Sequence, residues 1–203
     1  MLYVAVRAAR RAGDLIARAF DERDSFTVHQ KADRDYVTEV DQRAEALILR
    51  EITQHYPDHG IVAEESAQRV NPDASIQWYV DPLDGTTNFI HGYPHFAVSI
   101  SAWKDGKPLL AVVHDPIRDE TFEAKNGGGA FVNRRRLRVT SEKRLGHALF
   151  ASGMPSYQRE HIDLFQKRMD GCMSASTSIS LFRRSPLPSA PPFPAARPIA
   201  RRI

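Results

Sequence analysis

The 203-residue chain contains a single cysteine, Cys172, so no disulfide can form within it. Disulfides persist mainly in oxidising compartments, and their absence favours a reducing one. No apolar run approaches the roughly 18 residues that a membrane-spanning helix needs. The opening residues are not typical of a signal peptide, because Arg7, Arg10 and Arg11 interrupt their apolar stretch. We therefore expect a cytoplasmic protein that does not bind a membrane.

Acidic residues are absent after Asp170. Residues 171–203 carry five arginines and a charge of +5, so the +3 of the whole chain leaves −2 for residues 1–170. The net positive charge of the chain therefore comes from this C-terminal segment. The net charge of the remaining residues gives no reason to expect nucleic-acid binding. Six of the 13 prolines also lie between 186 and 198. Because dense proline blocks both helix and sheet, we expect residues 174–203 to be a disordered tail.

Apolar residues at helical spacing predict helices over 3–20 and 39–55, with polar, irregular text between them. Thr38 is a suitable N-cap for the second helix, and Asp41 stands at the capping-box position. The pattern then changes to short strand-like runs at 60–63, 76–80, 96–103, 109–114, 120–124 and 129–132. Helices followed by an antiparallel meander over 96–139 predict an α+β fold, with the helices packed on an antiparallel sheet.

Two carboxylates, Asp81 and Asp84, follow the apolar run 76–80 in the stretch YVDPLDGTTN. Carboxylates this close repel each other unless a positive group lies between them. Gly85 permits a tight turn, and the residues after it are suited to start a short helix, whose free amides bind anions. The stretch therefore combines oxygen ligands for a cation with a backbone seat for phosphate.

A second acidic cluster, Glu64 and Glu65, follows the run 60–63. If that strand lies beside 76–80, Glu64 reaches the same cleft, and oxygen donors without nearby Cys or His favour Mg²⁺ or Mn²⁺. The DPLDG fragment alone fits a surface turn equally well, whereas both clusters together favour a metal site. Asp41 is suited to a purely structural role as a helix cap, and Glu65 to a supporting role.

Three motifs, KADRDYVTEVD, IVAEES and WYVDPLDGTTNF, occur in this order and resemble the inositol monophosphatase family, closest to the bacterial inositol-1-monophosphatases. The resemblance covers about residues 1–155. It implies a family N-terminal domain over 1–155, a partial lead into a second α/β domain over 156–173, and the tail over 174–203. It also implies a phosphoric monoester hydrolase that acts on inositol 1-phosphate or another polyol or sugar monophosphate.

The family pattern implies a role for each matching residue. Glu64, Asp81 and the Leu83 carbonyl would hold one Mg²⁺, and Asp81 and Asp84 would share a second. Asp84 and the amides of Gly85 and Thr86 would bind the substrate phosphate. The reaction would be direct attack by a metal-activated water, with Glu64, Thr86 and Asp41 as catalytic residues. Lys31 and Asp35 match a mobile loop near the entrance.

The family continues into a second α/β domain with a Trp-Asp motif that supplies a further metal ligand, and nothing here matches that motif. We therefore expect a chain that is truncated or frameshifted after about residue 172, with reduced activity. Three alternatives stay open: a bisphosphatase of the same superfamily, a non-catalytic transcription or RNA partner that uses the basic tail and residues 134–138, and an inactive fragment. A homodimer is compatible with each enzymatic reading.

Overall fold

The computed structural model describes residues 1–22, 27–32, 35–66, 69–153, 162–175 and 178–182. These residues fall into two compact units, the first ending at Leu137 and the second starting at Arg138. The predicted boundaries near 155 and 173 do not coincide with this division, and the domain assignment stays a prediction. Each unit is described by itself below.

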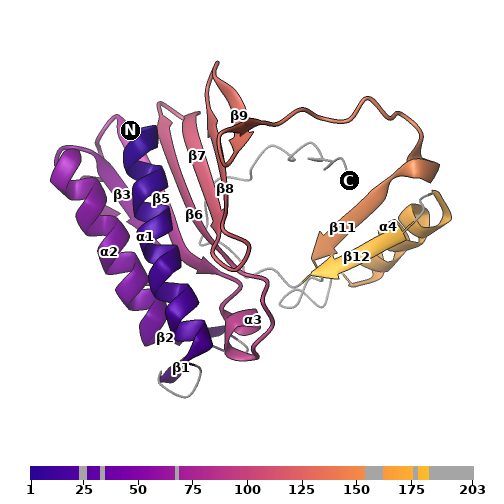
Figure 1. Ribbon diagram of the computed structural model, residues 1–203, viewed down its shortest axis with the longest axis horizontal. Coiled ribbons are helices and arrows are strands. Elements are labelled where there is room, and N and C mark those ends of the chain that lie inside the picture. The colour runs from indigo at the N-terminus through magenta and orange to yellow at the C-terminus, as the bar shows by residue number, and fades with distance from the viewer. Residues whose placement is uncertain (23–26, 33–34, 67–68, 154–161, 176–177, 183–203) are drawn as a thin grey trace. The chain divides into compact units, whose positions relative to one another are not determined.

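The first unit is built on an eight-stranded sheet with two helices against one face (Figure 1). The strand order is β10-β9-β8-β7-β6-β5-β3-β4. Every neighbouring pair is antiparallel except β3 and β5, which are parallel. The strands are β3 (Gly60–Ala63), β4 (Arg69–Val70), β5 (Ile76–Asp84), β6 (Ala97–Lys104), β7 (Lys107–Asp115), β8 (Glu120–Lys125), β9 (Gly129–Val132) and β10 (Arg135–Arg136).

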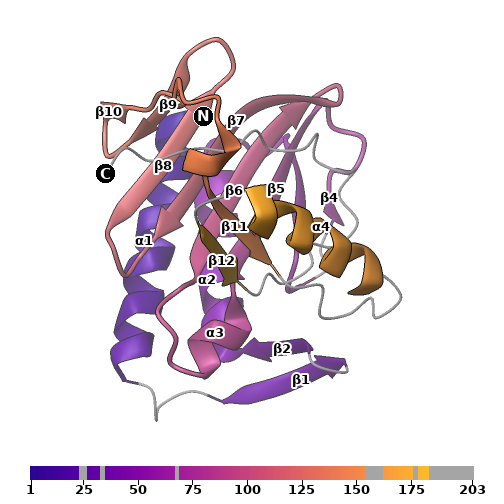
Figure 2. The same ribbon diagram turned by 90° about the vertical axis from the view of Figure 1, so that its right-hand side faces the viewer.

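The two helices are α1 (Leu2–Asp21) and α2 (Glu39–His55), which lie side by side on the sheet in both views (Figures 1 and 2). The buried face of α1 is rich in alanine, which lets the helix approach the sheet closely. The approach is tight at Gly13, because a Cβ atom there would lie 2.3 Å from Cδ2 of His114 on β7. The core between helices and sheet contains the fully buried side chains of Ile16, Ile48, Trp78 and Ile100.

Most predicted elements of this unit are confirmed. The helix over 39–55 begins and ends as expected, and the Thr38–Asp41 capping box is formed. The antiparallel meander is present, and the two runs at 60–63 and 129–132 have the predicted bounds. The sheet is mixed rather than purely antiparallel, because β3 pairs with β5 in the parallel sense.

Two local predictions were wrong. The strand expected to end at residue 80 continues to Asp84, because an irregularity between Asp81 and Asp84 lets the chain pass Pro82 and pair again with β6. The irregular stretch before α2 contains an antiparallel pair, β1 (Val28–Ala32) and β2 (Asp35–Thr38). The backbones of Lys31 and Asp35 lie in these strands, and their side chains are outside the described structure.

The second unit contains a parallel strand pair, β11 (Leu149–Gly153) and β12 (Ser178–Phe182), with α4 (Ile162–Ala175) between them in sequence. The last two residues of α4 and all of β12 lie inside the segment predicted as a disordered tail, so that prediction was wrong for residues 174–175 and 178–182. The run SISLF has strand-forming apolar residues and precedes the first of the clustered prolines at Pro186. Residues 183–203, which hold those prolines, lie outside the described residues.

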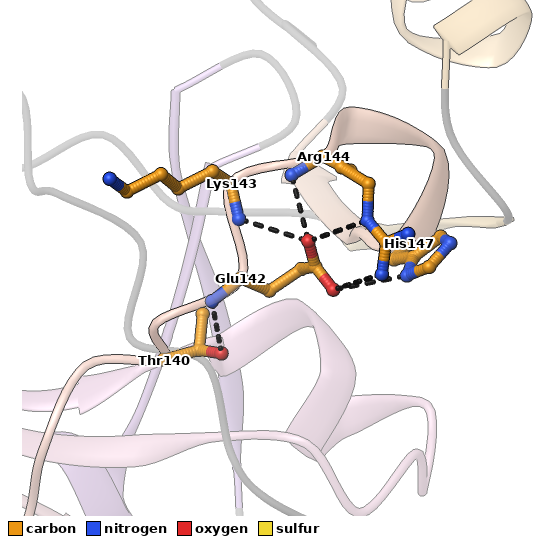
Figure 3. A network of polar contacts seen from close by, with 5 residues as sticks. All are labelled: Thr140, Glu142, Lys143, Arg144 and His147. Atoms are coloured by element: carbon orange, nitrogen blue, oxygen red, sulfur yellow. Dashed lines mark hydrogen bonds and ion pairs between the residues drawn. The ribbon is translucent and has the colours of Figure 1, made fainter.

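The second unit contains a polar network centred on Glu142, which extends into the short 3₁₀ helix η2 (Leu145–His147) (Figure 3). Glu142 Oε1 accepts hydrogen bonds from the backbone N–H of Lys143 (3.0 Å) and Arg144 (2.9 Å) and from Arg144 Nε (3.1 Å). His147 Nδ1 lies 3.0 Å from the other carboxylate oxygen. The Arg144 side chain and backbone contacts lower the pKa of Glu142 to about 2.

No helix within the described ranges is long and apolar enough to cross a membrane.

Candidate functional site

The predicted site residues of β3 and β5 lie at one end of the sheet. The two strands are parallel, with Ala63 opposite Val80. Glu64, which follows β3, and Asp81, which continues β5 opposite Ser99 of β6, therefore lie at the same end of the sheet. The Glu64 N–H donates to the Val80 carbonyl at 3.2 Å, which ties the two chain segments together. The condition set by the sequence, that 60–63 lies beside 76–80, is therefore met.

Asp81 is the most crowded carboxyl group at this edge. It is 5% exposed, and its Oδ1 accepts the Leu83 N–H at 3.1 Å. Burial raises its pKa well above the ordinary value, and the negative charges of Glu64 and Asp84 and a hydrogen bond with Glu64 raise it further. A divalent cation would relieve this repulsion, so the donor set fits a hard cation such as Mg²⁺.

The same carboxyl groups are not arranged around one metal position. Among the residues that the structure describes, no three His, Cys, Asp or Glu side chains could hold a metal ion together. The Leu83 carbonyl, another predicted ligand, accepts the Thr86 hydroxyl at 3.0 Å. The metal ligand set therefore stays a prediction, which the crowding of negative charge around Asp81 supports.

Gly85 connects β5 to the short helix α3 (Thr86–Ile90). It has φ 103° and ψ 29°, the left-handed region in which glycine is favoured. A Cβ atom would also lie 3.0 Å from the His95 carbonyl oxygen, so the position accepts no side chain without local rearrangement. The first amides of a helix have no acceptor within it, and those of α3 come directly after the acidic residues.

Asp41 and Thr86 are brought together from separate elements, as the sequence predicts for two catalytic residues. Asp41 is fully buried in the first turn of α2. Its Oδ2 accepts the Thr38 N–H at 2.9 Å and the Thr38 hydroxyl, and its Oδ1 accepts the Thr86 hydroxyl at 2.9 Å. Asp41 is therefore both the capping-box residue and a partner of the site, so the two readings of the sequence coexist.

The electrostatics of Asp41 differ from those of Asp81. Burial raises the pKa of Asp41, whereas the hydrogen bonds from Thr38 and Thr86 oppose the rise. The Thr86 hydroxyl has one hydrogen and two acceptors within reach, Asp41 Oδ1 and the Leu83 carbonyl oxygen. The Thr86 oxygen keeps lone pairs that accept a hydrogen from another group.

Glu45 was missed by the sequence analysis. It lies on α2 four residues after Asp41 and is only 3% exposed. Its Oε2 accepts the Glu65 N–H at 2.7 Å and its Oε1 accepts the Ser66 N–H at 2.9 Å. The available signal was a charged residue within the apolar stripe of a helix, between Ala44 and Ile48.

Comparison with known proteins identifies the family. The sequence profile described as the inositol monophosphatase family matches residues 1–185. The chain belongs to this family. The match extends past residue 155, where the family resemblance was predicted to end, and past residue 172, after which a truncation or frameshift was expected. It includes the whole of β12.

Family relatives and solved structures agree with this assignment. The protein named Nus factor SuhB from Vibrio cholerae is 45% identical over 167 residues, covering 82% of this chain and 62% of that protein. The crystal structure of the extragenic suppressor protein suhB from Bartonella henselae has a TM-score of 0.84 at 38% identity and covers 90% of this chain and 70% of that one. An inositol monophosphatase from Anabaena sp. PCC 7120 has a TM-score of 0.75 at 33% identity, covering 89% of this chain and 65% of its own.

The chain covers only part of the length of its relatives. It spans between 59% and 66% of the length of the curated relatives that it matches. The predicted family and its α+β fold are confirmed.

Proposed function

We propose that the chain is a Mg²⁺-dependent phosphoric monoester hydrolase that acts on inositol 1-phosphate or a related polyol or sugar monophosphate, with Mn²⁺ as an alternative metal. One observation carries the proposal. A buried carboxyl group, Asp81, is crowded by Glu64 and Asp84, directly before a glycine-started helix turn suited to bind phosphate. The family membership points to the same chemistry.

In this proposal Glu64, Asp81 and the Leu83 carbonyl would hold one Mg²⁺, and Asp81 and Asp84 would share a second. Bound there, Mg²⁺ supplies Lewis acidity and lowers the pKa of water. The amides of Gly85 and Thr86 donate to the phosphoryl oxygens and stabilise the charge that develops there.

Asp41 and Thr86 position the attacking water. When the Thr86 hydroxyl donates to Asp41 Oδ1, its oxygen accepts a hydrogen from the water, whose lone pair then faces phosphorus. In this proposal Glu64 takes the water proton as the new P–O bond forms. The ester P–O bond breaks, the leaving alkoxide oxygen takes up a proton from solvent, and the products are inorganic phosphate and the free alcohol.

The experiment is phosphate release from inositol 1-phosphate, with and without Mg²⁺, by this chain and by an Asp84→Asn variant. Mg²⁺-dependent release that falls at least 100-fold in the variant supports the proposal, because one ligand of a charged site is removed without changing its shape. No release from folded wild-type chain refutes it. A panel that includes fructose bisphosphate and a nucleotide bisphosphate tests the bisphosphatase alternative.

A second candidate function comes from the relatives that are named Nus factor SuhB. That name favours a role for this chain as a partner of the transcription machinery in the cytoplasm, with or without catalysis. The discriminating test replaces the chromosomal gene with the Asp84→Asn allele. Ribosomal RNA synthesis that is unchanged assigns the cellular role to binding, and its loss assigns the role to phosphate chemistry. Sedimentation of the purified chain tests whether it forms a homodimer.

A further inference from the structure

We infer that Glu45 is a positioning residue for the acidic edge of the site: it fixes the backbone that carries Glu64, and through it the affinity for a divalent cation. The inference rests on the proposed function, since it assigns Glu64 to a cation. It goes further because it gives a role to a residue outside the predicted ligand set.

The first support is the pattern of bonds that Glu45 makes. Both of its carboxylate oxygens accept backbone amides, from the two residues directly after Glu64, at 2.7 and 2.9 Å. A buried carboxylate needs such donors, and two in succession hold the two peptide planes at fixed angles. Because both oxygens are engaged, Glu45 acts through the backbone of the loop.

The second support is that Glu64 is held from both sides. Its own N–H donates to Val80 on β5, and the next two N–H groups donate to Glu45 on α2. The backbone of Glu64 is therefore fixed by two different elements. Its carboxyl group is thereby directed to Asp81, which it contacts.

The third support is the position of Glu45 on α2. It stands four residues after Asp41, so both side chains project from one face of the helix. Asp41 bonds Thr86 in the segment that follows β5, whereas Glu45 bonds the segment that follows β3. One helix face thus contacts both segments that border the predicted ligands, the one after β3 that carries Glu64 and the one that follows Asp84 at the end of β5.

The test uses Glu45→Gln in the whole chain, with Glu51→Gln as a matched control. Glu51 is another buried glutamate of α2, 5% exposed, but its carboxylate binds Arg7 (2.6 Å) and Arg11 (2.8 Å). In Glu45→Gln one amide N–H meets the new NH₂ group, donor against donor, while the side-chain volume stays the same. Both substitutions remove the charge of a buried glutamate, but only Glu45 lies beside the site.

The primary readout is Mn²⁺ binding by titration calorimetry, supported by the Mg²⁺ concentration that gives half-maximal phosphate release. We expect Glu45→Gln to weaken Mn²⁺ binding about 10- to 100-fold, the usual effect of changing a group that orients a metal ligand. The half-maximal Mg²⁺ concentration should rise by a similar factor, with kcat at saturating Mg²⁺ changed only a few-fold. Glu51→Gln should lower the melting temperature and leave Mn²⁺ affinity unchanged.

A second readout is independent of metal. Amide hydrogen exchange at residues 65 and 66 in metal-free protein should be at least tenfold faster in Glu45→Gln and unchanged in Glu51→Gln. If Glu45→Gln does not fold, Glu45→Asp, which shortens the side chain by one methylene, is measured in the same way.

The outcomes separate the two proposals. Wild-type Mn²⁺ affinity in folded Glu45→Gln, or equal loss of affinity in both variants, overturns the positioning role and leaves the proposed function standing. Absence of Mn²⁺ binding by the wild-type chain overturns both.

Discussion

Gly13→Ala should destabilise the first unit, although the same substitution in an ordinary helix stabilises it. In a helix interior, alanine is favoured over glycine by about 1 kcal/mol. At Gly13, however, the added Cβ would lie 2.3 Å from Cδ2 and 2.6 Å from Nε2 of His114. Atoms that close must separate, and the cost depends on whether the His114 ring can move.

The structure shows that the ring is held. His114 is 2% exposed, and its Nδ1 lies 3.1 Å from the Thr121 hydroxyl, which also accepts the Arg10 Nε–H at 2.9 Å. Overpacking of a well-filled core costs about 1–3 kcal/mol. After the gain in helix propensity, we expect a net loss of up to about 2 kcal/mol in the free energy of unfolding.

The assay is urea denaturation followed by tryptophan fluorescence, because both tryptophans, Trp78 and Trp103, belong to the first unit. The matched control is Gly171→Ala in α4, where nothing lies within 4 Å of the added Cβ. There we expect slower amide exchange in α4, by up to about fivefold, from propensity alone. A Gly13→Ala protein that is more stable than wild type would refute the reasoning, since it would mean that the helix is not pressed against His114.

Three further predictions concern single groups. Burial lowers the pKa of His114, so this histidine binds a proton more readily in the unfolded chain than in the folded one. The free energy of unfolding should therefore fall as pH drops below about 6.5. Urea titrations from pH 7.5 to 5.5 should show a smaller fall in His114→Gln than in the wild type. Arg144→Ala should raise the pKa of Glu142 from about 2 towards its ordinary value, which an NMR titration of the Glu142 carboxyl would follow; an unchanged pKa contradicts the contacts in Figure 3. Thr86→Ala should lower kcat about 100-fold, with little change in the substrate KM, and a purely structural Thr86 would instead lower the melting temperature at constant kcat.

Local chemistry made parts of this fold predictable. The helix over 39–55 could be placed to the residue because its start depends on Thr38 and Asp41, which cap it from within the same four residues. The pairing of β1 with β2 was missed because those strands are mostly polar and show no clear alternation. The continuation of β5 past Pro82 depends on its neighbour β6, which no local pattern reveals.

The site residues also divide into those that a local motif reveals and those that only the folded structure reveals. Glu64, Asp81, Asp84 and Thr86 could be singled out because their motifs are compact and chemically distinctive. Glu45 offered only a weak signal, a charge within the apolar stripe of its helix. Its partners are backbone amides 20 and 21 residues away, which no sequence motif marks. The contact between Asp41 and Thr86 spans 45 residues and was accessible only through the family resemblance.

The edges of the eight-stranded sheet have a consequence for self-association. An exposed edge strand is a template on which another chain can add a strand, the first step of many aggregation processes. Here the two edges are β10 and β4, each only two residues long, and three of their four residues are arginine. Such short, like-charged edges offer few backbone groups for pairing and repel a second copy. Strand addition at the two edges of this eight-stranded sheet is therefore disfavoured.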